Sequence, residues 1–451
     1  MSEEEKMSKE ELLAKAEEPA EDALKMHPFY RGKLEVALKA PVRDYDDFAI
    51  WYTPGVAESC KKIDEEPEEV YRQTNKGNMV AVISNGTRVL GLGDIGPEAS
   101  MPVMEGKSLL FKYLGGVDAF PICLDTKDTE EFINIVRNLQ PSLGGINLED
   151  ISNPECFRIL DRLREECDIP VFHDDQQGTA CVTLAGLINA FKYVDKDIKE
   201  STITLIGAGA ANVATIRLLE AYGVPSGNLI VCDSSGILNE GRKEDIDEKY
   251  REKRRLCEET NSENREGGIA EAMRDSAAVV ALSAPGPDII QKEWIENMDD
   301  ESIVFACANP IPEIWPWEAE EAGAAVVATG RSDFPNQVNN SLGFPAIFRG
   351  VLDVNAESIS DEMCVAAAEA LADYAAKGGV NPKEILPTME EREVYYHVAA
   401  ATAGQAIEEG LARAERTEEE VFESAREKIE RAQKQTRVLM DEGVIRPYEE
   451  E

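Results

Sequence analysis

The chain has 451 residues, enough for two or three domains with separate hydrophobic cores. Its 88 acidic and 47 basic side chains give a formal net charge of −41. That charge argues against nucleic acid or an anionic membrane as a partner, because phosphate groups attract Lys and Arg. No apolar stretch reaches the ~18 residues of a membrane span.

The charge and the cysteines together indicate the compartment. Nine cysteines, mostly in apolar runs and without a C-x-x-C pair, favour buried thiols in a reducing environment over a disulfide framework. The acidic start, Met1–Glu5, lacks the apolar core of a signal peptide, so we expect a cytoplasmic protein. Its acidity fits either an ordinary soluble enzyme or a halophilic one whose self-repulsion is screened by salt. We favour the halophilic interpretation.

The first elements in chain order are an acidic, Ala-rich arm over residues 1–28 and a β-hairpin over residues 79–92. The hairpin is predicted from two short apolar runs that flank Asn85-Gly86. We expect residues 29–177 to form the first domain and the arm to be a helix or a frayed extension.

A strand–helix–strand unit follows. Residues 144–148 and 169–172 are short apolar runs. Between them, Asn153 is expected to cap a helix that has Pro154 at its first position and runs to about Cys167. Such a unit implies parallel strands whose carboxyl ends meet at one edge. The pairs Glu149-Asp150 and Asp174-Asp175 should therefore emerge side by side.

The second half of the chain alternates strands and helices. An apolar helix over residues 178–193 leads to a strand at 201–206, a helix at 210–222 ended by Gly223, and further strands at 229–232, 277–282, 302–306 and 325–328. This alternation predicts an α/β fold with a doubly wound, Rossmann-like domain over residues 178–414. Residues from about 361 are helical, and residues 415–451 form a charged helix or tail.

Three acids at the predicted sheet edge, Glu149, Asp150 and Asp175, are candidate ligands of a divalent cation. Mg²⁺ and Mn²⁺ prefer carboxylate oxygens. Adjacent residues of a strand face opposite sides, so Glu149 and Asp150 share a metal only if the strand has ended. The alternative interpretation is that these acids cap helices.

A lysine and a tyrosine are candidate acid–base groups. Lys107 lies in Glu105-Gly-Lys107-Ser, where partial burial and a nearby cation would make it neutral enough to act as a base. Tyr52 precedes Thr-Pro-Gly, which fixes it at the mouth of a turn. A helix-surface lysine and a core tyrosine are the alternatives.

The loop Gly207-Ala208-Gly209-Ala210-Ala211-Asn212 lies between a predicted strand and a predicted helix, as a dinucleotide site requires. Asn212 stands where Gly or Ala is usual, which we expect to loosen helix–strand packing. Asp233 ends the next strand, where a carboxylate would bond both ribose hydroxyls and repel a 2′-phosphate. It therefore favours NAD weakly over NADP.

Several segments together resemble the malic enzyme family in its short prokaryotic and archaeal form. The resemblance runs from about Phe29 to Gly410 and includes Tyr52-Thr-Pro-Gly-Val-Ala57, Val89-Leu-Gly-Leu-Gly-Asp-Ile-Gly96, Pro102-Val-Met-Glu-Gly-Lys107, Asn147-Leu-Glu-Asp-Ile151, His173-Asp-Asp-Gln-Gln-Gly-Thr179 and Gln337-Val-Asn-Asn340. It implies oxidative decarboxylation of (S)-malate to pyruvate and CO₂ with reduction of NAD(P)⁺, dependent on Mg²⁺ or Mn²⁺. A homodimer or larger homo-oligomer is also implied. Since the chain ends at Glu451, we expect no acyltransferase-like extension of the kind some members carry.

The resemblance also implies roles for individual residues. Tyr52 would be the general acid, Lys107 the general base, and Asp174 the carboxylate that orients Lys107. The metal ligands would be Glu149, Asp150 and Asp175, and Arg88 would clamp a substrate carboxylate. Asn309, Asn339 and Asn340 would contact substrate or nicotinamide, and the choice between the last two stays open; loop hydrogen bonding is their alternative interpretation.

Two other hypotheses fit part of this pattern. A hydroxy-acid or amino-acid dehydrogenase that does not decarboxylate needs the base and the cofactor but not the three acids. A catalytically inactive dinucleotide-binding sensor needs only the glycine-rich loop, and the presence of Tyr52 and Lys107 speaks against it.

Overall fold

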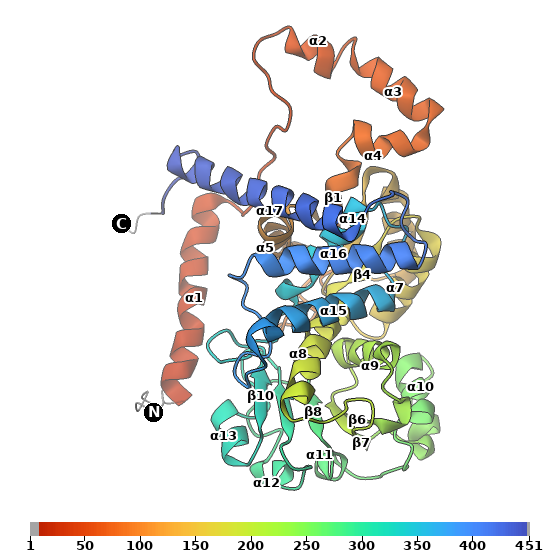
Figure 1. Ribbon diagram of the computed structural model, residues 1–451, viewed down its shortest axis with the longest axis vertical. Coiled ribbons are helices and arrows are strands. Elements are labelled where there is room, and N and C mark those ends of the chain that lie inside the picture. Colours follow the sequence, from red (N-terminus) through yellow and green to blue (C-terminus); the bar gives the residue numbers. More distant parts are fainter. Residues whose placement is uncertain (1–8, 449–451) are drawn as a thin grey trace.

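The computed structural model describes residues 9–448 and contains two β-sheets flanked by helices, one above the other in Figure 1. Residues 1–8 of the predicted acidic arm and residues 449–451 of the predicted tail lie outside the described residues. No helix among residues 9–448 is both long and apolar enough to cross a membrane.

The first sheet has four parallel strands in the order β2-β1-β3-β4; their bounds are β1 Met79–Ser84, β2 Asp118–Cys123, β3 Gly145–Leu148 and β4 Val171–His173. The predicted hairpin over residues 79–92 is wrong. β1 pairs with β2 and β3, and after Gly86 only a bridge between Val89 and Gly93 forms. The reason is burial: the interior of β1 is wholly buried, as in central parallel strands covered on both faces.

The predicted strand–helix–strand unit is confirmed as β3, α7 (Glu155–Glu166) and β4. Leu148 lies opposite His173 in the parallel register, so the two acidic pairs that follow emerge side by side. Asn153 does not cap the helix. Pro154, whose side chain has no hydrogen-bonding group, occupies the position before Glu155, and no side chain caps this end.

The second sheet has six strands in the order β10-β9-β8-β5-β6-β7, parallel except for β7. Its strands are β5 Ile203–Ile206, β6 Leu229–Asp233, β7 Gly236–Ile237, β8 Ala278–Ala281, β9 Ile303–Ala306 and β10 Val326–Thr329. β5, α9 (Ala210–Tyr222) and β6 form the predicted βαβ unit, and Gly223 ends α9 with a φ of +101°. The α/β fold with a Rossmann-like sheet is thus as predicted.

The remaining helices cover the two sheets. They are α5 Pro97–Gly115, α6 Thr129–Leu139, α8 Thr179–Tyr193, α10 Arg251–Glu259, α11 Ile269–Met273, α12 Lys292–Ile295, α13 Pro316–Glu321, α14 Phe344–Asp353, α15 Asp361–Ala375, α16 Glu393–Glu408 and α17 Glu418–Asp441. α14 and α17 return to the first sheet and pack against α5. The predicted boundary after residue 177 falls at the start of α8, between the sheets, and stays a prediction.

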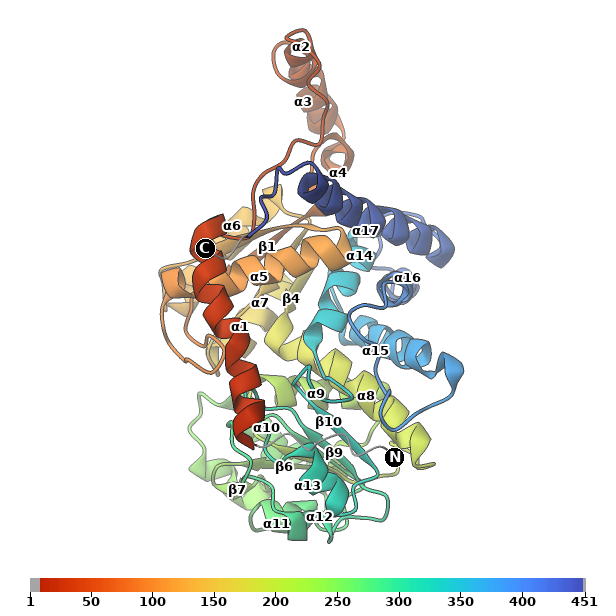
Figure 2. The ribbon, with the colours of Figure 1, turned by 90° about the vertical axis from the view of Figure 1, so that its left-hand side faces the viewer.

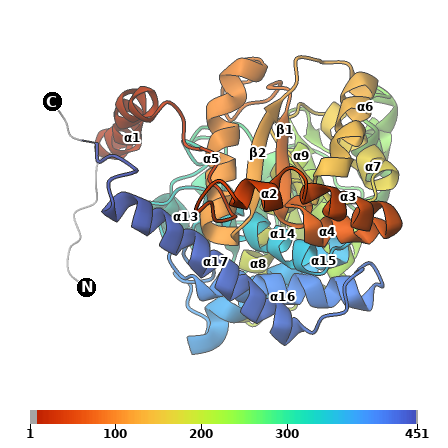
Figure 3. The same ribbon diagram turned by 90° about the horizontal axis from the view of Figure 1, so that it is seen from above.

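The N-terminal part of the chain is less compact. α1 (Lys9–Tyr30) runs beside both sheets, as Figure 2 shows, and its Tyr30 hydroxyl donates to the Arg446 carbonyl at 2.8 Å. Next comes a projecting segment, residues 34–66, which we name the tyrosine arm. It contains α2 (Asp47–Trp51) and α3 (Val56–Glu65) and is followed by α4 (Val70–Gln73). Figures 1 and 2 show α2 and α3 standing away from the body, and Figure 3 shows them from above, crossing its upper end.

Candidate active site

Lys107 lies on α5 with only 9% of its side chain exposed. Its ammonium group donates to Asp174 Oδ2 in a short contact, and Nζ lies 3.1 Å from Glu149 Oε1. The same nitrogen lies 4.5 Å from the centre of the Phe344 ring. Lys107 is therefore no helix-surface lysine, since it lies at the edge where β3 and β4 end, between two carboxylates and an aromatic face. We name Lys107, Glu149, Asp174 and Phe344 the lysine cluster.

Charge in this cluster is unevenly balanced. Burial by itself would lower the pKa of Lys107, but the Asp174 and Glu149 carboxylates outweigh it and raise the pKa above its usual range. Burial raises the pKa of Glu149 and of Asp174, because one ammonium group cannot offset several buried carboxylates. The two carboxylates thus favour the ammonium form of Lys107 in this arrangement.

The three predicted metal ligands lie close together without forming a cage. Asp175 Oδ2 accepts the Asp150 N–H at 2.9 Å, whereas Glu149 Oε2 accepts from the Asn147 amide at 2.9 Å. Among the described residues, no three His, Cys, Asp or Glu side chains are grouped so as to hold a metal ion. Lys107 and Asn147 engage the two oxygens of Glu149.

The chemistry of these donors nevertheless fits a hard divalent cation. Asp150 Oδ2 is buried and has no hydrogen-bond partner among the described residues. Burial and then the neighbouring Asp175 raise the pKa of Asp150 to about 7. Asp150 also has a left-handed φ of +53°, which turns it out of the alternation of β3. An all-oxygen set with an unused buried acceptor suits Mg²⁺ or Mn²⁺.

Asp174 and Asp175 begin a single π-helical turn, Asp174–Gly178, between β4 and α8. Such turns occur frequently at functional sites. A Cβ on Gly178 would lie 1.9 Å from Asp174 Oδ1 and 3.4 Å from the Cβ of Asn340. Gly178 is thus required for Asp174 to face Lys107, and Asn340 borders the same spot.

The other predicted polar contacts are distributed unevenly. The Asn339 side chain accepts the Ser341 N–H at 3.0 Å, so it caps a local turn, whereas Asn340 faces Gly178. Asn309 follows β9, and its amide lies against Gly330. It stands in the second sheet's loops, apart from the lysine cluster.

Arg88 lies on the loop after β1, beside the acids. Its N–H donates to the Asp150 carbonyl at 3.1 Å, and the Leu90 N–H donates to Asp150 Oδ1 at 3.3 Å. The Arg88 guanidinium is exposed and donates to the Leu90 carbonyl. The structure therefore brings Arg88 to the mouth of the cluster.

Tyr52 is the predicted site residue that the structure leaves outside. It follows α2 on the tyrosine arm with 71% of its surface exposed, so it is no core tyrosine. Its backbone bonds only to Phe48 and Val56, its neighbours on the arm. Helix α2, which Tyr52 follows, stands away from the body that contains α5, the helix of Lys107 (Figure 1).

The glycine-rich loop has the expected geometry. Gly207 has a φ of +101°, and a Cβ there would lie 2.7 Å from the Leu282 carbonyl, so only glycine fits. Gly209, Ala210 and Ala211 lead into α9. The expected loosening at Asn212 is wrong, since its buried amide donates to the Ile206 and Gly207 carbonyls at 2.9 and 2.8 Å and ties α9 to the strand end.

Asp233 ends β6 at the carboxyl edge of the second sheet. Its Oδ1 accepts from the Ser235 N–H at 2.9 Å and from Arg242 Nη1 at 3.0 Å. Its Oδ2 accepts from Arg242 Nη2 and from Lys253 Nζ, both at 3.3 Å. The carboxylate predicted to meet a ribose is already engaged by four donors.

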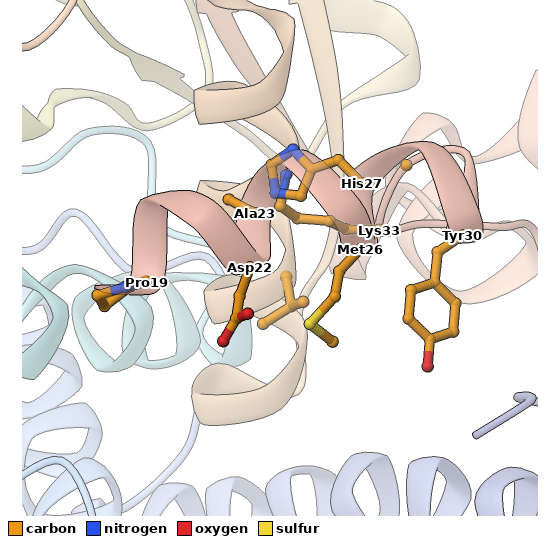
Figure 4. Close-up of a pocket in the computed structure, with 9 residues that line it drawn as sticks. Pro19, Asp22, Ala23, Met26, His27, Tyr30 and Lys33 are labelled. Carbon is orange, nitrogen blue, oxygen red and sulfur yellow. The ribbon is translucent and has the colours of Figure 1, made fainter. Parts of the chain in front are cut away.

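A hollow of about 500 Å³ between α1 and α5 contains none of the predicted site residues. It is lined mainly by α1 together with Gly32, Lys33 and Leu109. Figure 4 shows Asp22, Met26 and Tyr30 pointing to one side of α1. This hollow separates α1 from the body, and the lysine cluster lies on α5 away from it.

Comparison with known proteins identifies the family. Residues 31–164 match the malic enzyme N-terminal domain, and residues 176–407 match the malic enzyme NAD-binding domain. The chain belongs to the malic enzyme family. It is 50% identical over 382 residues to the NAD-dependent malic enzyme of Geobacillus stearothermophilus, covering 85% of this chain and 78% of that one. It is 44% identical over 397 residues to the NADP-dependent malic enzyme of Halomonas elongata, covering 85% and 92%.

A solved malic enzyme structure extends the match to the fold. The crystal structure of the Entamoeba histolytica malic enzyme superposes with a TM-score of 0.94 at 46% sequence identity. The superposition covers 98% of this chain and 93% of that one. It therefore reaches beyond the compact body.

Sequence reasoning missed several members of the site. Phe344 contacts Lys107 from a position that no local motif marks. Asn147, which contacts Glu149, stood within a quoted motif but was assigned no role. Gly178 stood within the quoted acidic motif, but its need appears only once Asp174 is placed beside it. Arg242 and Lys253 lie in a charged segment between two predicted strands, and their only signal is its high density of basic residues.

Proposed function

We propose that this chain catalyses the oxidative decarboxylation of (S)-malate to pyruvate and CO₂ with reduction of NAD⁺ or NADP⁺. The observation that carries the proposal is the buried Lys107 between Asp174 and Glu149, at a sheet edge with two further acids. A base beside a group of oxygen donors suits removal of a proton from a 2-hydroxy acid. A dehydrogenase that does not decarboxylate has no need for the extra acids.

Each residue has a defined task in this proposal. Lys107 takes the proton of the malate C2 hydroxyl, and Asp174 holds its amine in place. Arg88, at the mouth of the cluster, pairs with a substrate carboxylate. Tyr52 protonates C3 after CO₂ has left, which gives pyruvate. Asn340, beside Gly178, contacts the substrate, and Asn309 contacts the nicotinamide.

Glu149, Asp150 and Asp175 would hold Mg²⁺ or Mn²⁺. A bound cation would supply Lewis acidity to the substrate, and a bound dinucleotide would supply a hydride acceptor. For Lys107 to act as a base, Glu149 must turn away from its amine, because the two carboxylates together hold it as an ammonium group. We further propose that the enzyme works in a salt-rich cytoplasm, which its net charge of −41 suits.

Because Tyr52 is exposed on the projecting arm, we propose a homodimer that exchanges its tyrosine arms, so that each Tyr52 reaches the lysine cluster of the partner copy. Exposed apolar side chains on the arm support this: Val36 81%, Leu38 81%, Val42 46%, Tyr45 89%, Phe48 48%, Ile50 57%, Trp51 48% and Val56 38%. Contiguous apolar surface on this scale is characteristic of interfaces.

A matching surface borders the lysine cluster. Leu90 and Leu92 are 63% and 69% exposed on the loop that bonds to Asp150. An arm that covers these residues would place its tyrosine at the mouth of the site, where Arg88 lies. Two-fold symmetry makes the exchange reciprocal, so each dimer has two composite sites. The superposition with the Entamoeba malic enzyme, which covers 98% of this chain, supports the placement of the arm.

The test is reduced-nicotinamide absorbance with L-malate and Mn²⁺, using NAD⁺ and NADP⁺ separately at low and at multimolar KCl. The expected result is pyruvate formation that EDTA abolishes and that rises with KCl, as screening lets two acidic copies associate. Nucleotide reduction without CO₂ release would indicate a non-decarboxylating dehydrogenase. Cofactor binding without turnover at any salt concentration would indicate a sensor.

A further inference from the structure

The nucleotide site carries a positive cluster within a strongly acidic chain. Seven of the 14 residues from 242 to 255 are Lys or Arg and five are Asp or Glu, whereas the whole chain has a net charge of −41. Arg254 and Arg255 pair with acids outside the cofactor site, namely Glu244 and Glu220. Arg242 and Lys253 instead converge on Asp233.

Asp233 occupies the position where a dinucleotide fold recognises the adenosine ribose. In the parallel register Ile206 lies opposite Cys232, so Asp233 stands beside Gly207 of the glycine-rich loop. A carboxylate has about four acceptor sites, and all four here are used, by Ser235, by two nitrogens of Arg242 and by Lys253. The acid is thus saturated, and the cluster of one carboxylate and two cations has a charge of +1.

The two cations differ in freedom. Arg242 Nη1 also donates to the Gly236 and Ile237 carbonyls at 2.9 and 3.2 Å, so Arg242 is fixed within the β6–β7 turn. Lys253, whose flexible side chain is 23% exposed, reaches Asp233 from α10 by one 3.3 Å hydrogen bond, and its amine also lies 5.4 Å from the centre of the Tyr250 ring. Lys253 is therefore the donor that can turn to a new anion while Arg242 keeps Asp233 neutralised.

We propose that Lys253 forms a 2′-phosphate subsite at the adenosine ribose, so that this chain accepts NADP⁺ and prefers it to NAD⁺. The preference predicted from Asp233 alone is reversed, because the saturated carboxylate neither bonds the ribose freely nor repels a phosphate. The inference rests on the proposed function only in placing a dinucleotide beside the glycine-rich loop. It concerns binding and does not depend on which acid is oxidised.

The experiment compares binding of 2′,5′-ADP and of 5′-ADP to the full chain by calorimetry at about 0.15 M salt. Wild-type protein should bind 2′,5′-ADP about tenfold more tightly, the effect of one charge-assisted contact. Lys253→Gln should abolish that ratio and leave 5′-ADP affinity within about twofold. Lys243→Gln, on the same segment but paired with Glu258, should preserve the ratio.

Two results would overturn the proposal: equal or weaker binding of 2′,5′-ADP by the wild type, or an equal loss of both ligands in Lys253→Gln. Malate turnover is measured in parallel. A 2′,5′-ADP preference without turnover would refute the proposed reaction and keep the phosphate subsite. Malate turnover with NAD⁺ but not with NADP⁺ would support the proposed reaction and refute the phosphate subsite.

Discussion

The lysine cluster and the tyrosine arm contrast in nearly every physical respect. Lys107 is 9% exposed and held by two carboxylates and a ring, whereas Tyr52 is 71% exposed and bonded only to its own arm. In the proposed dimer, one half of the acid–base pair is preorganised by folding, and the other is positioned only when two copies meet. The comparison separates what a single chain builds from what assembly adds.

Removal of the buried half should have the largest effect. Lys107→Ala should lower kcat by about 10³-fold or more, since the reaction loses its general base. NAD(P)⁺ affinity, measured by calorimetry, should be unchanged because the glycine-rich loop lies on the other sheet. Lys112→Ala is the control on the same helix, where the lysine pairs with Asp118. A kcat within tenfold of wild type would rule out Lys107 as the base.

Removal of the exposed residue, Tyr52, should lower kcat less than removal of Lys107. A second chain with an intact Tyr52 should restore part of the lost activity. Tyr52→Phe should lower kcat by about 10²-fold. When Tyr52→Phe and Lys107→Ala chains are co-refolded in equal amounts, half of the dimers are mixed and each has one intact composite site, so about a quarter of wild-type activity should return. If each chain used its own tyrosine, no activity would return.

A methyl group added at Gly178 should test how tightly the buried half of the site, around Asp174 and Lys107, is packed. Gly178→Ala would place a Cβ 1.9 Å from Asp174 Oδ1, so Asp174 must move away from Lys107. We expect a kcat loss of about ten- to a hundredfold with the dimer intact by sedimentation. Gly378→Ala, where a Cβ meets no atom within 4 Å, should be harmless. Unchanged kcat in Gly178→Ala would show that the Asp174 contact is dispensable.

The smallest effect should appear in assembly. Trp51→Glu places a charge on the apolar surface of the arm and should weaken dimerisation about tenfold, equivalent to ~1.4 kcal/mol. Sedimentation velocity over a concentration series measures this shift. Tyr193→Glu, an exposed aromatic residue at the end of α8, is the matched control. Equal association constants for Trp51→Glu and wild type would argue that the arm does not form the interface.

The sequence predicted those features that depend on neighbours along the chain. The β3–α7–β4 unit with its acidic pairs and the β5–α9–β6 unit with its glycine-rich loop were both found, because turns, caps and apolar runs mark them locally. The hairpin after β1 failed, since Asn-Gly is a local signal whereas the partners of β1 are the distant β2 and β3. The saturated Asp233 was missed for the same reason, as Lys253 lies 20 residues away on another element.

The aromatic ring that covers the Lys107 amine comes from a helix far along the chain. Phe344 on α14 covers the Lys107 amine, and its ring lies 4.7 Å from that of Phe111. The matched NAD-binding region, residues 176–407, therefore supplies part of the first sheet's core. A recombination event that exchanged only that region between two relatives would also replace the helix that carries this aromatic ring. Viable chimeras should therefore keep α5 and α14 from one parent. The contact between these helices limits which segments relatives can exchange by recombination.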